Sequence, residues 1–207
     1  MYLKKGHVLL APGSTEIKNV ADHSAGSLSA YLRAATRSNH DAVDAAFGAS
    51  ELTSRNGYRN FLLAHARVVP LVERLLAPSD MIDGWEGRTA ALFQDLAALG
   101  LERPREIDFV LPDGEAARWG ALYVVEGSRL GGAMLVRGVP EGLPTAYLAD
   151  VHGHGKWREL LAALDAAEQD MVWRQDAVAG AKAMFGAYLL ATRIDAEEPD
   201  SASKHQI

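Results

Sequence analysis

The sequence contains no cysteine, and this absence excludes several kinds of chemistry. A chain without thiols has no disulfide framework, zinc–thiolate site, iron–sulfur cluster or cysteine nucleophile. Any transition metal that its side chains hold must therefore use nitrogen or oxygen ligands, or the weaker sulfur of methionine. Seven histidines supply the candidate nitrogen ligands.

The sequence is also short of positive charge and of long apolar runs. It carries 21 Lys and Arg against 27 Asp and Glu, a formal net charge of −6, whereas a surface that holds nucleic acid needs a basic excess. Nowhere do 18 uncharged apolar residues follow one another, so no segment is expected to span a membrane as a helix. The apolar run 8–11 is short for a secretory signal. We therefore predict a cytoplasmic protein that binds neither nucleic acid nor membranes.

The hydrophobic pattern has a period of 3.6 residues over most of the chain, which is typical of amphipathic helices. At 207 residues one domain is the default, and we predict a single all-α domain over 27–195. The flanking segments 1–26 and 196–207 lack this period and are predicted to be a flexible extension and a disordered tail. Residues 101–112 are a predicted connector, and 138–155 a Gly- and Pro-rich loop with one short turn. The six main helices are predicted at about 28–47, 58–76, 85–99, 113–135, 157–172 and 176–194.

The first predicted helix, capped by Ser27, carries a histidine at the edge of its apolar stripe. At about 100° per residue, His40 lies roughly 120° from Leu28. Arg33 precedes His40 by seven residues and Asp44 follows it by four, on the same side of the helix. This spacing suits an imidazole that binds a ligand through one nitrogen while Asp44 orients the ring through the other. The alternative interpretation is a boundary histidine in an ordinary helical His–Asp pair.

Four glycines fall within residues 120–132 of the predicted helix 113–135. A glycine inside a helix costs about 0.8–1.0 kcal/mol relative to alanine, so four cost roughly 3–4 kcal/mol of a typical domain stability of about 5–15 kcal/mol. Close helix–helix packing is one explanation, and it suffices for Gly120. For Gly127, Gly131 and Gly132 we favour the approach of a flat ligand to bare backbone.

Together these two features predict a slot for a planar metal macrocycle, between a helix with a nitrogen ligand and a helix without side-chain bulk. Haem fits, because histidine is the usual proximal ligand of its iron in globins and peroxidases. The two propionates of haem need cations at the mouth of the slot. Arg33, Lys156 and Arg158 are the candidates.

Two segments of the sequence make this hypothesis specific. The run Leu32-Arg-Ala-Ala-Thr-Arg-Ser-Asn-His40, followed by Asp44 and Phe47, resembles the proximal helix of haem oxygenases. The run Leu122-Tyr-Val-Val-Glu-Gly-Ser-Arg-Leu-Gly-Gly132 resembles their distal helix, in the Glu-Gly-Ser-x-Leu-Gly-Gly form of the bacterial branch linked to bacterial phytochromes. The segments 156–158 and 181–188 match a propionate-binding basic residue and a haem-contacting aromatic of the family more weakly. The resemblance covers about residues 27–195.

The resemblance implies a haem-degrading enzyme in which haem b lies between a proximal helix and a glycine-rich distal helix. It implies His40 as the axial iron ligand and catalytic roles for Gly127, Ser128 and Gly131 on the distal face. The haem-binding residues that it implies are Arg33, Thr36, Asp44, Tyr123, Gly132, Arg158 and Phe185. The family's reaction converts haem and O₂ into biliverdin, carbon monoxide and ferrous iron, with electrons from an external reductase or ferredoxin. The implied partners are that electron-donor protein and a phytochrome that receives biliverdin.

Two residues depart from the family's pattern. Ser128 stands where many relatives carry an aspartate, and because a hydroxyl cannot hold a charge, the proton path stays open. Asp44 is one methylene shorter than the usual glutamate, so its contact to His40 can pass through water. A non-catalytic haem- or bilin-binding protein on the same fold is the alternative function. A thiamin-degrading enzyme of this architecture would need the cysteine nucleophile that the chain lacks.

The remaining histidines carry weaker hypotheses. His152 and His154 could bind a metal, but they lie in a Gly-rich loop without an adjacent third ligand. His65 is interpreted as a helix-packing residue. The position of meso-carbon cleavage, the oligomeric state and the role of residues 1–26 cannot be derived from the sequence.

Overall fold

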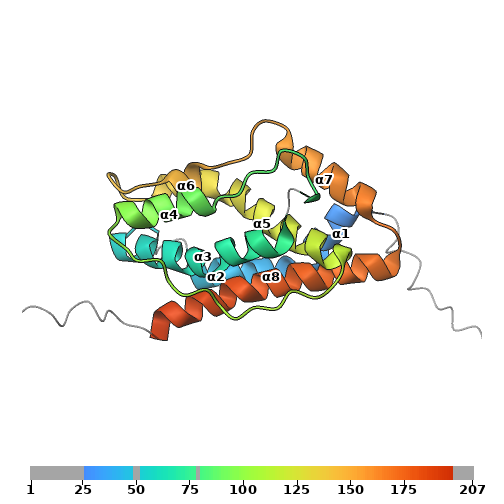
Figure 1. The fold of residues 1–207 in the computed structure, drawn as a ribbon, viewed down its shortest axis with the longest axis horizontal. Helices are drawn as coiled ribbons and strands as arrows, with labels where there is room; N and C mark the ends of the chain where they lie inside the picture. The colour runs from blue at the N-terminus through green and yellow to red at the C-terminus, as the bar shows by residue number, and fades with distance from the viewer. Residues whose placement is uncertain (1–25, 49–51, 78–79, 198–207) are drawn as a thin grey trace, which may run out of the picture.

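The computed structural model describes residues 26–48, 52–77 and 80–197 (Figure 1). Within these ranges all the regular elements are helices, which confirms the predicted all-α fold. They are α1 (Leu28–Ala35), α2 (Arg37–Phe47), α3 (Arg55–Leu76), α4 (Thr89–Ala98), α5 (Glu115–Leu135), the 3₁₀ turn η2 (Val136–Gly138), α6 (Ala146–Ala149), α7 (Lys156–Ala167) and α8 (Met171–Glu197). Most of the predicted extension and tail lies outside the described residues. None of the described helices has the length and hydrophobicity needed to cross a bilayer.

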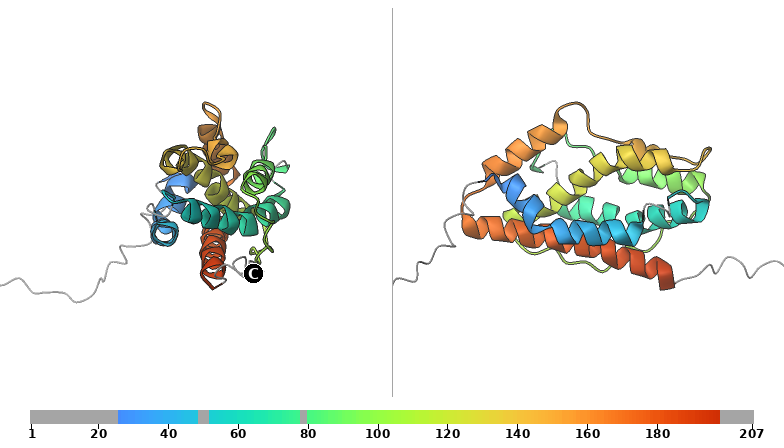
Figure 2. Two further views of the ribbon diagram at one scale, coloured as in Figure 1. Left: turned by 90° about the vertical axis from the view of Figure 1, so that its left-hand side faces the viewer. Right: turned by 180° about the vertical axis from the view of Figure 1, so that it is seen from behind.

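Helices α5 and α8 pack closely against each other along the bundle. A Cβ atom added to Gly120 of α5 would collide with the backbone carbonyl of Ala177 in α8, and one added to Gly180 of α8 would collide with Ala117 in α5. Each helix thus contributes a glycine where the other passes, which confirms packing as the reason for Gly120. The end-on view in Figure 2 places α1 and α2 on one side of the bundle and α4 on the other.

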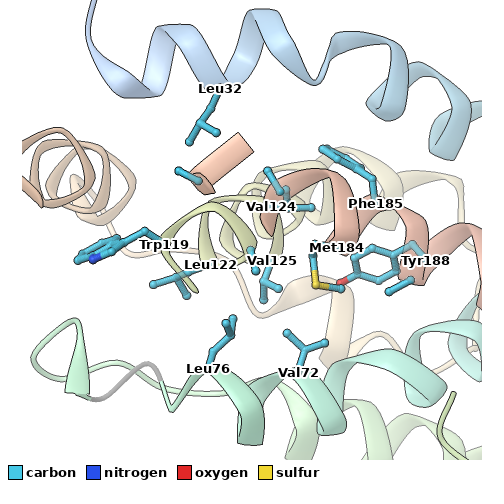
Figure 3. Packing of buried hydrophobic residues seen from close by; sticks show 14 of the residues in the cluster. Leu32, Val72, Leu76, Trp119, Leu122, Val124, Val125, Met184, Phe185 and Tyr188 are labelled. Carbon is cyan, nitrogen blue, oxygen red and sulfur yellow. The ribbon is translucent and has the colours of Figure 1, made fainter. Parts of the chain in front are cut away.

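The larger of two core clusters fills the space where α3, α5 and α8 meet (Figure 3). Val72 and Leu76 enter it from α3, Leu122 and Val125 from α5, and Met184 from α8, all of them buried. Burying an aliphatic side chain of this size contributes about 1.5–3 kcal/mol, so this cluster fixes the relative positions of the three helices.

The single helix predicted at 28–47 is wrong, because the chain turns at Thr36 into the two helices α1 and α2. Thr36 has φ −112° and ψ 6°, and its buried hydroxyl donates a hydrogen bond to the carbonyl of Leu32 at 2.7 Å. A threonine hydroxyl that binds the carbonyl four residues back competes with the regular helix. The apolar stripe calculated for one straight helix therefore fails beyond Thr36: α2 buries none of its residues, and Ala46, expected in the stripe, is exposed.

Helices α3 and α4 begin at other residues than predicted. Ser54 caps α3 by accepting a hydrogen bond from the backbone N–H of Gly57, so that α3 starts three residues early. α4 starts at Thr89 rather than at 85. The carboxylate of Glu73 on α3 accepts from the backbone N–H of Arg88 at 2.6 Å and from the Thr89 hydroxyl at 2.6 Å, which fixes the first turn of α4 against α3.

The corner between α7 and α8 lies at 168–170, five residues before its predicted place. Asp170 caps α8 by accepting from the backbone N–H of Trp173 at 2.8 Å. Arg174 binds both carboxylate oxygens of Glu168, at 2.5 and 2.8 Å, and donates to the carbonyl of Gly26. The expected short turn within 138–155 is confirmed as α6.

Candidate functional site

His40 on α2 is an exposed imidazole that a carboxylate orients directly. Its Nδ1 lies 3.0 Å from Oδ2 of Asp44, and the two side chains are 62% and 66% exposed. A carboxylate only accepts hydrogen bonds, so in the neutral ring the tautomer with its proton on Nδ1 fits this contact and leaves the Nε2 lone pair for a ligand. The contact is direct rather than mediated by water. Phe185 of α8 meets the His40 ring edge-on, with 6.0 Å between the ring centroids.

The glycines of α5 fall into two groups. A Cβ on Gly131 would meet nothing within 4 Å, and one on Gly127 would meet only the side chain of Trp157, at 3.6 Å. A Cβ on Gly132, by contrast, would lie 2.8 Å from the carbonyl oxygen of Leu148, so packing against α6 by itself accounts for this glycine. The haem-binding role predicted for Gly132 gains no support from its surroundings.

An exposed apolar face accompanies the two unpacked glycines. Leu130 and Met134, one turn apart on α5, are 43% and 75% exposed. At helical spacing Gly127, Leu130, Gly131 and Met134 share one face of α5. The rear view in Figure 2 shows α1, α2 and α5 on the same side of the bundle.

Of the predicted propionate-binding cations, Arg33 on α1 has a neighbour on α5. Burial raises the pKa of the Tyr123 phenol, and the charge of Arg33 lowers it in part, so the Arg33 charge acts on this side chain of α5. The Tyr123 ring lies 5.8 Å from Trp157 of α7. Arg158 is exposed on α7, whereas Lys156 forms a 2.9 Å ion pair with Glu159.

The predicted site residue Thr36 lies in the turn before α2 rather than on an open face. It is buried, its hydroxyl is bound to Leu32, and its carbonyl accepts from the backbone N–H of His40 at 3.0 Å. Thr36 therefore sets the direction in which α2 leaves α1. Its contact with haem stays a prediction.

A buried polar cluster behind the glycines was missed from the sequence. Arg88, 2% exposed, donates from Nη2 to Oγ of Ser128 at 2.6 Å and to the carbonyl of Val125 at 3.1 Å. Burial by itself would lower the pKa of Arg88, but Tyr147, Tyr188 and the nearby carboxylates raise it overall, so the guanidinium stays charged. Its partners on α5 lie about 40 residues away in the sequence. No pattern among neighbouring residues could therefore predict these hydrogen bonds.

Glu126 is the second buried charge of this cluster, 1% exposed. Its Oε1 accepts from Nε1 of Trp85 at 2.9 Å, and its Oε2 lies 3.3 Å from Nε of Arg129 and 3.4 Å from Nε2 of His152. The sequence could have predicted this buried charge. Glu126 follows Leu122 by four residues and so lies on the buried stripe of the helix, and a buried carboxylate needs a cation as its partner.

The other histidines that the structure describes are packing and loop residues. Nε2 of His152 also lies 3.1 Å from the carbonyl oxygen of Glu126. The residues that the structure describes contain no group of three or more potential metal ligands. His65 is buried against Phe61, Tyr147 and Tyr188, which confirms it as a packing residue. Burial lowers the pKa of His65 to about 3.

A cavity of about 740 Å³ opens elsewhere, beside α4. It is lined by Glu73, Gly87, Thr89, Ala90, Phe93, Gln94 and Arg103. None of the predicted site residues lines this cavity, so the chemistry expected at His40 does not belong to it.

Comparison with known proteins identifies the family. No protein-family model matches the chain. A heme oxygenase of Xanthomonas campestris pv. campestris (strain 8004) is 38% identical to it in an alignment 145 positions long, and the match covers 62% of this chain and 84% of that relative. The chain belongs to the haem oxygenase family.

Solved haem oxygenase structures share the fold. The NO- and CO-bound heme oxygenase from Neisseria meningitidis superposes with a TM-score of 0.72 at 26% sequence identity, covering 88% of this chain and 100% of that chain. Heme oxygenase from Leptospira interrogans has a TM-score of 0.64 at 18% identity, covering 81% and 98%, a likeness of fold. Both the resemblance and the fold expected from the sequence are thereby confirmed.

Proposed function

We propose that this chain binds haem b beside α2 and the glycine-bearing face of α5, with His40 as the axial ligand of the iron. Its reaction, as a haem oxygenase, is the oxidative cleavage of haem to biliverdin, carbon monoxide and ferrous iron. Membership of the family supports the reaction. The single observation that carries the site is the direct contact between His40 and Asp44.

The described residues fit a flat, apolar, dianionic ligand. His40 offers Nε2 from an exposed ring, and Gly131 leaves the space beside its backbone open. Leu130 and Met134 supply exposed apolar surface on the same helix. Each Å² of this surface that the haem covers would contribute about 25 cal/mol to the free energy of binding. Arg33 provides a cation for a propionate.

Bound haem supplies the iron that activates O₂ and the meso carbon that is oxidised. His40 would contribute a neutral imidazole, with Nδ1 turned toward the Asp44 carboxylate at 3.0 Å. A carboxylate in this place orients the ring and makes Nε2 a stronger donor. Phe185 packs against the same ring in a T-shaped contact and limits its rotation.

On the distal face the backbone, more than the side chains, shapes the site. Gly127 and Gly131 let a planar group approach α5 closely, and Ser128 lies between them in the sequence. The Ser128 hydroxyl is half-buried and hydrogen-bonded to Arg88 and to Val125. It therefore offers one oriented hydroxyl where many relatives have a carboxylate.

The proposal extends to partners. An external reductase or a ferredoxin is the electron donor, and a phytochrome is the acceptor of biliverdin. The Glu-Gly-Ser-x-Leu-Gly-Gly form of residues 126–132 supports the second of these. A cytoplasmic location is part of the same proposal, because reduced electron donors are kept inside the cell.

Absorption spectroscopy tests the function. Haem is added to the purified protein, the Soret band is recorded, and ascorbate is supplied in air. We expect the Soret band to give way to the absorption of biliverdin. A haem spectrum that persists under these conditions would contradict the enzyme and favour the non-catalytic haem-binding protein.

Substitution of His40 tests the ligand assignment. His40→Ala should remove the axial nitrogen and change the haem spectrum, while His154→Ala, which alters an exposed loop histidine, should not. An unchanged haem spectrum in His40→Ala would refute His40 as the iron ligand, but it would not contradict the proposed cleavage of haem.

A further inference from the structure

Helix α1, which precedes the helix of the proposed iron ligand, is firmly held by the rest of the protein. Leu28 and Leu32 are fully buried in the larger core cluster. The start of α1 is fixed as well, because the carboxylate of Asp165 on α7 accepts from the backbone N–H of Ser29 at 2.8 Å and from its hydroxyl at 3.2 Å. α1 therefore has a fixed position from which the chain enters α2.

Helix α2, which carries His40, is held less firmly. None of its residues is buried, and Val43 and Phe47 pack against the core from partly exposed positions. The rear view in Figure 2 shows α1 running obliquely and α2 lying lengthwise beside α8, so the chain changes direction between the two helices. The direction in which α2 leaves α1 thus decides where the imidazole lies.

Thr36 stands at the corner between the two helices. Its backbone N–H and its buried hydroxyl both donate to the carbonyl of Leu32, at 3.0 and 2.7 Å. A threonine hydroxyl that binds the carbonyl four residues back bends a helix, because this carbonyl turns toward the side chain. On the other side of the corner, the carbonyl of Thr36 accepts from the backbone N–H of His40 at 3.0 Å. One residue therefore links the fixed helix α1 to the ligand-bearing residue of α2.

We propose that Thr36 is a positioning residue for the iron ligand, whose hydroxyl bends the chain between α1 and α2 and thereby directs His40 toward the haem. The inference rests on the proposed function of the site. This role requires no contact between Thr36 and haem, since the residue acts through His40. Without the hydroxyl, the hydrophobic period of residues 28–47 favours one continuous helix, which would carry His40 to another place beside α8.

The two side-chain contacts of His40 depend on the corner to different degrees. Asp44 lies on α2 itself, four residues after His40, so this contact moves with the helix and survives a change in its direction. Phe185 belongs to α8, and its edge-on contact with the imidazole at 6.0 Å holds only if α2 leaves α1 as observed. Loss of the Thr36 hydroxyl should therefore displace the imidazole while its hydrogen-bond partner stays the same.

A purely structural hydroxyl is the competing explanation, since any buried hydrogen bond contributes to stability. Thr192 provides the matched control. Its hydroxyl also donates to a backbone carbonyl of its own helix, that of Leu189 in α8 at 2.9 Å. Thr192→Val should lower the stability of the protein as Thr36→Val does, but it should leave the direction of α2 unchanged.

Distances between spin labels test the corner in the haem-free protein. The chain has no cysteine, so cysteines introduced at the exposed residues Ala46 of α2 and Val172 of α8 carry the labels and nothing else does. Electron–electron resonance then gives the distance distribution between them. We expect Thr36→Val, which has the shape of threonine but no hydroxyl, to shift this distribution. Thr36→Ser, which keeps the hydroxyl, and Thr192→Val should both match the wild type.

The haem-loaded full-length protein tests the link to the iron. Resonance Raman spectra of the ferrous protein give the iron–imidazole stretching frequency, and absorption titration gives the haem affinity. We expect Thr36→Val to shift this frequency and to weaken haem binding about 10–100-fold, as loss of a group that orients a metal ligand commonly does. Thr36→Ser should restore both values. Thr36→Ala, which also lacks the hydroxyl, replaces Thr36→Val if that variant does not fold.

An unshifted distance distribution in Thr36→Val would overturn the inference, because the hydroxyl would then not set the direction of α2. A shifted distribution with the frequency and affinity of the wild type would overturn it too, and so would equal shifts in Thr192→Val. A wild type that shows the iron–imidazole band but forms no biliverdin would refute the proposed reaction and leave the inference standing. Absence of that band in the wild type would refute both the ligand and the inference.

Discussion

Alanine at Gly131 and at Gly132 separates the approach of a ligand from the packing of helices. Both residues lie inside α5, where alanine is favoured over glycine by about 0.8–1.0 kcal/mol. A Cβ at Gly131 meets nothing within 4 Å, so this gain is unopposed. A Cβ at Gly132 would lie 2.8 Å from the backbone oxygen of Leu148, which cannot rotate away as a side chain can.

The two substitutions should therefore change the stability of the haem-free protein in opposite directions. Gly131→Ala should raise the free energy of unfolding by about 0.5–1 kcal/mol, which corresponds to roughly 1–4 °C in Tm for a chain of this size. Overpacking typically costs about 1–3 kcal/mol, so Gly132→Ala should lower the free energy of unfolding despite its gain in helix propensity.

Haem binding should follow the reverse order. Thermal and urea unfolding of the haem-free variants give the stabilities, and absorption titration with haem gives the affinities. Gly131→Ala should bind haem more weakly than the wild type although its fold is more stable. The new methyl group would fill the space in which the haem plane approaches the α5 backbone. Gly132→Ala should keep nearly the wild-type affinity. Unchanged haem affinity and turnover in Gly131→Ala would refute the placement of haem against this backbone.

Three further predictions concern other residues. Asp44→Asn should leave the unfolding free energy within about 0.5 kcal/mol, because the pair with His40 is exposed, yet weaken haem binding or turnover about 10–100-fold in absorption assays; wild-type values in both would remove Asp44 from the site. The pKa of His65 is lowered by burial to about 3, against 6.5 in the unfolded chain, so its contribution to stability is complete above about pH 6.5 and is lost toward pH 3, at up to about 1.4 kcal/mol per pH unit. Urea melts between pH 3 and 6.5 give the unfolding free energy at each pH. This free energy should change less steeply with pH in His65→Leu than in the wild type, and an equal dependence on pH would contradict the burial of His65. Arg174→Met should lower the free energy of unfolding by about 3 kcal/mol because it leaves Glu168 unpaired at the α7–α8 corner, and a change below about 1 kcal/mol in denaturant melts would show that the pair is dispensable.

Much of the fold followed from signals between residues close in the sequence. The 3.6-residue period predicted the helical class, and Ser27 was predicted as the N-cap that it is, accepting from the backbone N–H of Ala30. The His40–Asp44 contact was predictable for the same reason, since residues four apart on a helix are neighbours. These relations depend on backbone geometry alone.

The wrongly predicted helix boundaries have two causes. Some depend on contacts between segments distant in the sequence, and one depends on a side-chain hydrogen bond that competes with the helical backbone. The first turn of α4 depends on Glu73, and the α7–α8 corner depends on Arg174 and Glu168. The division of the first helix depends on the Thr36 hydroxyl, whose bond to Leu32 the hydrophobic period does not register. Periodicity measures which face is apolar, but it does not measure which hydrogen bond wins at a boundary.

The sequence by itself determined that this protein is helical, that it has no thiol chemistry, and that a histidine with a carboxylate partner accompanies a helix rich in glycine. Only the tertiary structure decided what each glycine is for: Gly132 faces the backbone of α6, whereas Gly131 faces none. It also brought Arg88 to Ser128 across 40 residues. The physical reason is that close packing and buried charge depend on neighbours in space, which the helical period cannot specify.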